Sequence, residues 1–368
     1  MCTIFYAFDG DVALAGNNED SSNPRTKVWF VPRTGGEVGG REFRAGHGRT
    51  YFGYDNWLPE GAVNDQGLFF DAVAVDVVRM AEQAGKPLFE GNLVDAFMAE
   101  CASVRDVERF LTRYSFHDGG WNGAYLVGDR HGDSAVIEPF GAWAVLRRRG
   151  RFQIATNFWQ SQTKPEERVC GRYHIAEEML GAADSFSVEL FRSVLSAVHQ
   201  ERFTQTLYSN ICDLCTGLVY LYNFHNFEDV VVLDTTAELQ KGAHGIDLPS
   251  LFPRSFAAEQ YAVQMAEDEA ITQQIRLAAV GGASASAADV AAYEGRYGGS
   301  PGIDLTVEAR DGRLHYGGIG SEGELMPQRG AGFSSKSGLE FTFLRAEPGP
   351  ATGVLVSFGG GRFLARRG

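Results

Sequence analysis

Short hydrophobic blocks, separated by turn signals rich in glycine, proline and aspartate, occupy most of the chain, and this pattern is typical of β-strands. At the start, β-forming residues cover 3–8 and 12–15 with an Asp-Gly pair between them, so the sequence predicts a β-hairpin. A turn at that pair places Cys2 opposite Asn17, and a turn shifted by one residue places it opposite Glu19.

The next hydrophobic blocks predict a layered arrangement of sheets and helices. Residues 26–31 are predicted as a strand, and the continuous apolar run at 68–75 is typical of a strand buried on both faces. Residues 88–101 and 103–114 are predicted as helices, the second with apolar positions at helical spacing. Further short strands are predicted at 122–129, 134–138, 142–147 and 152–156. Strands followed by helices and more strands fit a sandwich of sheets with outer helical layers.

The C-terminal part of the chain differs in composition from the rest. An alanine-rich, helix-prone stretch at 255–279 is followed by small, weakly hydrophobic residues that are typical of a flexible linker. Beyond the linker, short hydrophobic strands alternate with turns, which predicts a small antiparallel β module. We therefore expect a first domain at 1–279, a linker at 280–289 and a small β domain at 290–368.

The overall composition narrows the range of partners. The 368 residues are 44% hydrophobic and 22% charged, which is ordinary for a folded soluble protein. There is no apolar run of about 18 residues, the length that spans a bilayer. The net charge of −14 argues against a nucleic-acid-binding surface, which needs basic residues to neutralise phosphates. We expect a small-molecule substrate, no nucleic-acid or membrane partner, and leave a homo-oligomer open.

The five cysteines indicate a reducing environment. Their number is odd, and the start of the chain lacks the basic and apolar regions of a secretory signal, so we predict a cytoplasmic protein. Cys212 and Cys215 have the spacing of half a zinc site, but no second pair of metal ligands accompanies them. The simpler interpretation is a pair of strand cysteines, because free cysteine is commonly buried. We therefore predict no metal and no other cofactor.

Cys2 is the candidate nucleophile. Once Met1 is removed, Cys2 carries both a thiol and a free α-amine, whose ordinary pKa is about 7.7–8.0. The neutral amine can accept the thiol proton, and a nearby carboxylate such as Asp20 can hold the amine in place. The competing interpretation is a small, buried strand cysteine without chemistry.

Several motifs then add a resemblance to a known family. They are Met-Cys-Thr at 1–3, Gly-Asn-Asn-Glu-Asp at 16–20, Gly-Ala-Val-Asn-Asp-Gln-Gly-Leu at 61–68, Ala-Thr-Asn at 155–157, Thr-Leu-Tyr-Ser at 206–209 and Gly-Leu-Val-Tyr-Leu-Tyr-Asn at 217–223. The chain resembles the N-terminal nucleophile (Ntn) hydrolases, in the cysteine branch of choloylglycine (bile salt) hydrolases, penicillin V acylases and isopenicillin N acyltransferases. The resemblance implies an α+β protein with a four-layer αββα sandwich. The small antiparallel β C-terminal domain resembles the one appended to β-lactamase-like serine hydrolases.

The resemblance also implies a set of catalytic residues. Cys2 takes the role of the nucleophile, with Asn18 and Asp20 on the second strand of the hairpin. Asn157 matches an asparagine whose amide donates to the oxyanion formed during attack, an interaction worth about 2.7–4 kcal/mol. Arg172 falls where the family has an arginine in a Ser-Arg-aromatic context, although the serine is absent here.

Two positions depart from the pattern of the bile-salt-hydrolase-like relatives. Asn17 stands where they carry an arginine, and an asparagine supplies no fixed positive charge, which argues against bile salts as substrates. Ala74 stands where they carry an asparagine of the oxyanion site. Either Asn122 or a backbone N–H would then have to replace that donor.

Candidate substrate contacts combine polar and aromatic side chains. Tyr54, Trp57 and Phe158 favour an apolar or aromatic acyl group, although such residues also make ordinary core. Asn17 and Asn122 complete the predicted substrate-binding set.

The favoured function is hydrolysis of a linear amide, a carbon–nitrogen bond other than a peptide bond, through a thioester on Cys2. An acyltransferase or cyclase of a biosynthetic pathway would use the same thioester and deliver the acyl group to an amine or an internal nucleophile. A binding protein that kept the fold without turnover is the third hypothesis, motivated by Asn17 and Ala74.

Overall fold

The computed structural model describes residues 2–80, 83–116, 120–140, 142–201, 204–279, 290–298, 304–319, 321–328, 332–345, 349–358 and 361–368. The chain forms two compact units. The first comprises Met1–Asp20, Arg25–His199 and Thr206–Arg254, and the second comprises Ser21–Pro24, Gln200–Gln205 and Ser255–Gly368. The long helix α6 (Phe256–Ala279) therefore groups with the second unit. The predicted linker at 280–289 lies outside the described residues.

The first unit contains a six-stranded and an eight-stranded sheet. The six-stranded sheet has the order β12-β1-β2-β13-β14-β15. Its strands are β1 (Thr3–Phe8), β2 (Ala13–Ser21), β12 (Phe152–Ala155), β13 (Gln205–Asp213), β14 (Leu218–Asn223) and β15 (Asn226–Asp234). The N-terminal hairpin thus lies inside this sheet, between β12 and β13.

The eight-stranded sheet has the order β11-β10-β9-β8-β7-β6-β3-β16. Its strands are β3 (Thr26–Val31), β6 (Arg49–Tyr54), β7 (Pro59–Asn64), β8 (Leu68–Arg79), β9 (Gly120–Asp129), β10 (Ser134–Phe140), β11 (Ala142–Arg147) and β16 (His244–Asp247). A separate ribbon joins β4 (Gly36–Val38) to β5 (Arg41–Phe43). Short helices η1 (Pro165–Glu167), α5 (Thr235–Leu239) and η2 (Leu248–Leu251) connect the strands.

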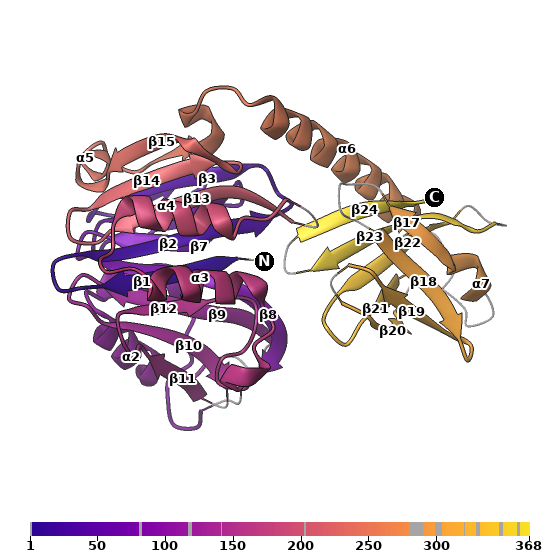
Figure 1. The fold of residues 1–368 in the computed structure, drawn as a ribbon, viewed down its shortest axis with the longest axis horizontal. Coiled ribbons are helices and arrows are strands. Elements are labelled where there is room, and N and C mark those ends of the chain that lie inside the picture. Colours follow the sequence, from indigo (N-terminus) through magenta and orange to yellow (C-terminus); the bar gives the residue numbers. More distant parts are fainter. Residues whose placement is uncertain are drawn as a thin grey trace. The chain divides into compact units, whose positions relative to one another are not determined.

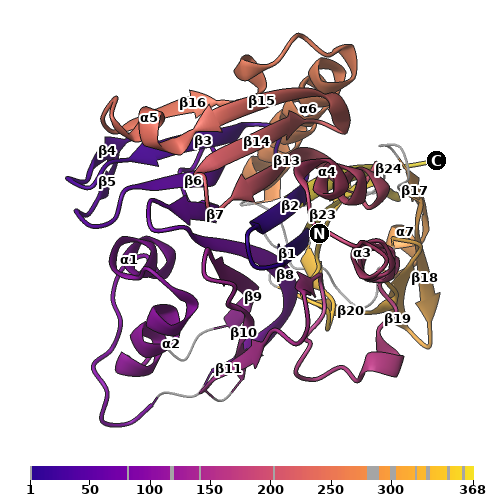
Figure 2. The ribbon, with the colours of Figure 1, turned by 60° about the vertical axis from the view of Figure 1, so that its left-hand side comes forward.

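Helices cover the outer face of each sheet (Figures 1 and 2). Helices α1 (Leu93–Glu100) and α2 (Val104–Arg113) pack on the eight-stranded sheet, where Phe97 and Phe110 share a buried cluster with Phe70. Helices α3 (Gly171–Gly181) and α4 (Val188–Ala197) pack on the six-stranded sheet through a second buried cluster. The predicted αββα sandwich is therefore confirmed.

The hairpin follows the second of the two predicted registers. Thr3 pairs with Asn18 and Phe8 pairs with Ala13, so continuing the ladder places Cys2 opposite Glu19. The loop is longer than the Asp-Gly pair because Asp9 closes it: its N–H donates to the Val12 carbonyl over 3.3 Å, and its Oδ1 accepts from the Val12 N–H over 3.2 Å.

The first helix starts later than predicted. Leu88 forms a bridge with Ser115, and the Phe89 N–H donates to the Ser115 carbonyl, so this segment is extended. Asn92 then caps α1, its side chain accepting from the Asp95 N–H over 2.8 Å. The cap, and not the apolar pattern, sets the start of the helix.

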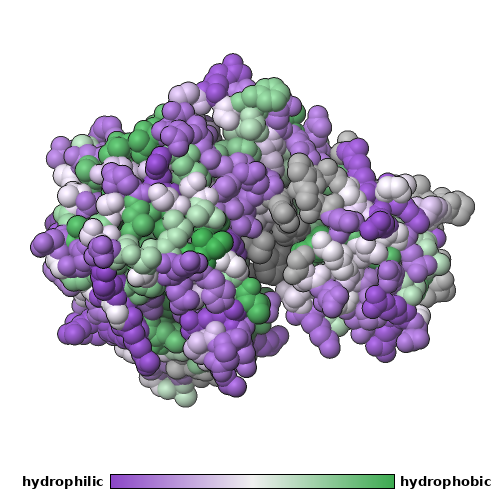
Figure 3. Space-filling view, in the orientation of Figure 1, coloured by the Kyte–Doolittle hydropathy of each residue, from purple (hydrophilic) through white to green (hydrophobic). Residues whose placement is uncertain are grey.

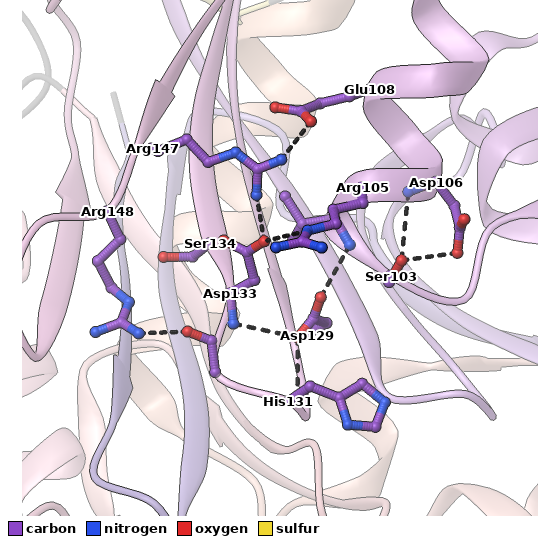
Figure 4. A network of polar contacts seen from close by, with 12 residues as sticks. Ser103, Arg105, Asp106, Glu108, Asp129, His131, Asp133, Ser134, Arg147 and Arg148 are labelled. Carbon is purple, nitrogen blue, oxygen red and sulfur yellow. Dashed lines mark hydrogen bonds and ion pairs between the residues drawn. The ribbon is translucent and has the colours of Figure 1, made fainter.

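Helix α2 matches the predicted helix and is tied to the sheet by polar contacts (Figure 4). Asp129 accepts from the Val104 N–H over 3.0 Å, which satisfies a donor in the first turn of α2. Arg147 donates to both Glu108 on α2 and Asp133, and so joins the helix to β11. This network stabilises the layer that supports β8 and β9.

The second unit contains a closed antiparallel barrel of strands β17 to β24. Its core is rich in aromatic residues, among them Tyr297, Phe341 and Phe343, and it is preceded by the short helix α7 (Val290–Tyr293). The strands are β17 (Gly295–Gly298), β18 (Asp304–Arg310), β19 (Arg313–Gly317), β20 (Gly323–Pro327), β21 (Gly332–Ser334), β22 (Glu340–Arg345), β23 (Ala351–Phe358) and β24 (Gly361–Arg367). The predicted small β domain is confirmed.

The surface of the first unit mixes polar and hydrophobic side chains on the face that carries α3 and α4 (Figure 3). None of the helices in the described part of the chain is both long enough and apolar enough to cross a membrane.

Candidate active site

The hairpin brings Cys2 against a buried polar segment of β2. Only 6% of Cys2 is exposed, and Asn17, Asn18, Glu19 and Asp20 are all buried on the neighbouring strand. Four successive polar residues in a sheet interior are unusual, because burying polar groups is costly unless they are hydrogen-bonded. The partners of each residue therefore decide what this segment does.

Arg172 links the residues around Cys2 from the first turn of α3. Its Nη1 donates to the Cys2 carbonyl over 2.6 Å and to Thr3 Oγ1 over 2.7 Å. Its Nη2 donates to Asn157 Oδ1 over 2.8 Å, and Nη1 lies 3.7 Å from Asp20 Oδ2. One guanidinium thus fixes the backbone of the nucleophile, an amide and a carboxylate at once.

Asn157 is held at both ends of its side-chain amide. Its Oδ1 accepts from Arg172, and its Nδ2 donates to the Ala74 carbonyl over 2.7 Å. An amide nitrogen carries two hydrogens, so one remains for a substrate oxygen. Ala74 contributes its backbone carbonyl to this arrangement.

Asp20 is a buried acid that interacts with Thr206 and Arg172. Its Oδ1 accepts from Thr206 Oγ1 over 2.5 Å, and Arg172 lies near its Oδ2. Burial raises the pKa of Asp20 to about 7, while Arg172 and the hydrogen bond from Thr206 oppose that rise. The carboxyl therefore titrates close to neutral pH.

Glu19 is a site residue that the sequence analysis did not select. Its Oε1 accepts from Tyr54 Oη over 2.6 Å, and its Oε2 accepts from Asn17 Nδ2 over 3.5 Å. This carboxylate lies close enough to Cys2 for its charge to raise the pKa of the thiol. Burial raises the pKa of Glu19. The only sequence signal for it was the register that places Cys2 opposite Glu19.

The environment keeps the Cys2 thiol protonated. Burial raises the pKa of Cys2 well above its ordinary value, and the charge of Glu19 raises it further. A thiol is a weak nucleophile, since the thiolate is the reactive form. Chemistry at Cys2 therefore needs a base that removes the proton as the bond to the substrate forms.

Asn18 points toward the helical layer. Its Nδ2 donates to the Leu195 carbonyl of α4 over 2.8 Å, and its Oδ1 accepts from Ser209 Oγ over 2.6 Å. Asn17 lies on the other face of β2, next to Glu19 and Tyr54. Of the predicted residues on β2, the structure brings Asn17 and Asp20 into the polar cluster around Cys2, and it uses Asn18 to hold α4.

The other predicted substrate contacts are spread over the unit. Tyr54 lies beside Glu19, as described above. Trp57 packs edge-on against Trp29 and beside Gly39, and Phe158 packs against Tyr173 of α3. Asn122 belongs to β9, and its side chain lies outside the described residues.

The cysteines are all free, with Cys212 buried and Cys215 exposed. Within the ranges that the structure describes, no three His, Cys, Asp or Glu side chains are grouped so that they could hold a metal ion.

Comparisons with known proteins give the fold. Neither a protein-family model nor a curated protein matches the sequence. The structure is similar to a conjugated bile acid hydrolase from Clostridium perfringens, with a TM-score of 0.55 and 15% identity over 69% of this chain and 97% of that chain. A penicillin V acylase from Agrobacterium tumefaciens gives a TM-score of 0.54 and 16% identity over 67% of this chain and 91% of that chain. The first unit therefore has the αββα fold of the Ntn hydrolases, and the predicted resemblance is confirmed at the level of the fold.

Proposed function

We propose that the protein is a cysteine amidohydrolase that cleaves a linear amide through a thioester on Cys2. The observation that carries the proposal is the network of Arg172, which joins the Cys2 carbonyl, Asp20 and Asn157. The names of the two structural neighbours, a bile acid hydrolase and an acylase, support the same class of reaction.

The first step is formation of the thioester. After Met1 is removed, the α-amine of Cys2 takes the thiol proton, and Sγ bonds to the amide carbonyl carbon of the substrate. The carbonyl oxygen becomes an oxyanion, which accepts the free N–H of Asn157 Nδ2. When the carbon–nitrogen bond breaks, the leaving amine takes the proton from the α-ammonium, and the acyl group stays on Sγ.

The second step returns the enzyme to its starting state. Water attacks the thioester carbonyl while the α-amine accepts one of its protons, and the carbon–sulfur bond breaks. The thiolate recovers the proton from the α-ammonium, and the carboxylic acid leaves. Asp20 serves as the acceptor that orients the α-ammonium, while Arg172 holds the Cys2 carbonyl and Asn157 in place.

The test combines mass spectrometry with a substrate panel. The mature protein should begin at Cys2, and N-acyl amino acids, penicillin V and bile conjugates should be tried as substrates of the wild type, Cys2→Ser and Cys2→Ala. We expect hydrolysis of at least one amide and a mass increase on Cys2 equal to its acyl group. Turnover that persists in Cys2→Ala would refute the mechanism.

The same assay distinguishes hydrolysis from acyl transfer, the alternative fate of the thioester. An added amine competes with water for the acyl group, and mass spectrometry measures the ratio of the new amide to the free acid. Free acid as the sole product at every amine concentration rules out transfer to that amine.

A further inference from the structure

A second group of buried acids lies between the two sheets, beyond the nucleophile. Glu19 of β2 reaches the eight-stranded sheet through Tyr54 of β6. Asp71 of β8 is fully buried, and its Oδ2 would lie 2.4 Å from a Cβ at Gly61 of β7. The absence of a side chain at residue 61 therefore leaves the space that the Asp71 carboxylate occupies.

Tyr208 lies over the strand pairs that carry these groups, since Gly61 pairs with Phe52 on one side and with Asp71 on the other. It belongs to β13 of the six-stranded sheet, and its ring packs against Phe52 of β6 with the centroids 6.5 Å apart. Burial raises the pKa of Tyr208, and the charges of Glu19, Asp71 and Cys2 contribute to the rise. The interior acidic cluster is defined here as Glu19, Asp71, Asn17 and Tyr208.

Several polar atoms of the interior acidic cluster lack a partner. Asn17 Oδ1, Asp71 Oδ2 and Tyr208 Oη accept or donate no hydrogen bond among the residues that the structure describes, and each side chain belongs to a residue with no exposed surface. Buried polar atoms are nearly always hydrogen-bonded in folded proteins. Three unpartnered atoms next to one nucleophile therefore point to a ligand.

The interior acidic cluster also lacks a cationic side chain. No lysine or arginine of the described ranges forms an ion pair with Glu19 or Asp71, and the buried Arg49 pairs with Asp95 instead. Asp and Glu are rarely buried unless they are paired. The N-terminal α-ammonium opposes the rise in the pKa of Glu19, so Asp71 is the carboxyl without a cationic neighbour.

We propose that the acyl group of the substrate ends in an alkylammonium, which binds between Glu19 and Asp71. This inference rests on the proposed function, since it assigns a substrate class to the same Cys2 site. An ammonium carries three N–H donors and no acceptor. The unpartnered Asn17 Oδ1 and Asp71 Oδ2, together with the carboxylate of Glu19, match those donors in number and kind.

The protonation states support this assignment. Burial raises the pKa of Glu19 and of Asp71, and burial together with the charge of Glu19 raises the pKa of Glu60 to about 8. Without a cation, burial favours the protonated form of these carboxyls. A bound ammonium favours the ionised carboxylates, and their protons pass to solvent.

The first experiment compares acyl groups of matched length. The wild type is assayed with the p-nitroanilides of δ-aminovaleric, hexanoic and glutaric acid, which end in an ammonium, a methyl and a carboxylate. We expect kcat/KM for the ammonium substrate to exceed that for the methyl substrate by about tenfold or more, with the carboxylate substrate slowest. An equal or higher kcat/KM for the hexanoyl substrate would overturn the proposal.

Substitutions test whether the interior acidic cluster causes the preference for the ammonium substrate. Asp71→Asn keeps the shape and removes the charge, and should lower the ratio of ammonium to methyl kcat/KM by about tenfold. Gly61→Ala should do the same by displacing the Asp71 carboxylate. Glu228→Gln, at a side chain that is 89% exposed on β15, is the matched control and should leave the ratio unchanged. A ratio that survives both Asp71→Asn and Gly61→Ala contradicts the assignment.

A binding measurement separates this inference from the proposed function. Pentylammonium should raise the Tm of Cys2→Ala, pentanol should not, and the rise should disappear in the Cys2→Ala/Asp71→Asn double variant. Stabilisation by pentylammonium without any amide turnover would retain the cation site and refute the hydrolase. Amide turnover with neither stabilisation nor an ammonium preference would retain the hydrolase and refute the cation site.

Discussion

The two faces of β2 carry adjacent polar residues with different surroundings. On the face toward α4, Asn18 donates to Leu195 and accepts from Ser209, so both of its polar atoms have partners. On the face toward the eight-stranded sheet, Asn17 Oδ1 has none among the described residues, although Asn17 and Asn18 are equally buried. Asparagine thus joins two layers of the fold at position 18, whereas at position 17 its side-chain oxygen remains available to a ligand.

Burial alone does not separate structural from functional polar residues. A partnered buried amide contributes to stability, and its removal leaves the partner unsatisfied. An unpartnered buried amide costs stability unless something else binds it. Substitutions on the two faces should therefore affect different quantities, activity on one and the free energy of unfolding on the other.

Blocking the N-terminus should have the largest effect on activity. A peptide fused ahead of Cys2 converts its nitrogen into an amide without basicity, so we expect kcat to fall by about 10²–10⁴-fold. The fold should not change, and the Tm should stay that of the free protein. A C-terminal tag of equal length is the control. An undiminished rate with the blocked terminus would reject the α-amine as the base and leave Glu19, whose charge raises the pKa of the Cys2 thiol, as the candidate acceptor.

Asn157→Ala should lower kcat by about 10²–10³-fold, because it removes a donor to the oxyanion. KM should change little, since this interaction forms mainly in the transition state. The steady-state rates are compared with those of Asn226→Ala, an exposed asparagine at the start of β15. Equal loss in both variants, or a change confined to KM, would argue against the oxyanion role of Asn157.

Asp20→Asn should alter how stability depends on pH. The pKa of Asp20 is raised to about 7 in the folded protein from an ordinary value of 3.8, so the folded state binds its proton more tightly than the unfolded state. The resulting stabilisation is fully present below the unfolded pKa and is lost as the pH rises through 7. Urea unfolding across this range should show a decline in the wild type that is smaller in Asp20→Asn. Parallel curves would show that Asp20 does not titrate there.

Ser209→Ala should have the smallest effect and act on stability alone. It removes one hydrogen bond to Asn18 on the α4 face, so we expect the free energy of unfolding to fall by about 1 kcal/mol with kcat/KM unchanged. Tyr54→Phe is its counterpart on the inner face, where the lost bond to Glu19 should change kcat/KM. If Ser209→Ala impairs activity as strongly as Tyr54→Phe, the contrast between the two faces is wrong.

The sequence by itself determined the elements that depend on local pattern. The β-forming runs before and after the Asp-Gly pair predicted the hairpin, which placed Cys2 near Asp20 in either register. The apolar spacing at 104–111 predicted α2, and the short strands after 290 predicted the antiparallel barrel. These features follow from periods of two and 3.6 residues, which neighbouring residues carry without help from distant ones.

Only the tertiary structure decided which faces meet and which side chains converge. Arg172 is 170 residues from Cys2 in the chain, and no local rule brings its guanidinium to the Cys2 carbonyl. The pattern of β2 gave no preference for Glu19 over Asn17 as the residue opposite Cys2. That choice depended on Asp9 closing a longer loop and on the packing of one face against α4 and the other against Tyr54. Trp57 is an aromatic residue of the kind that lines pockets, but it packs against Trp29 and beside Gly39 in a hydrophobic cluster of the first unit. Burial depends on where the layers of the fold meet and not on the residue type alone.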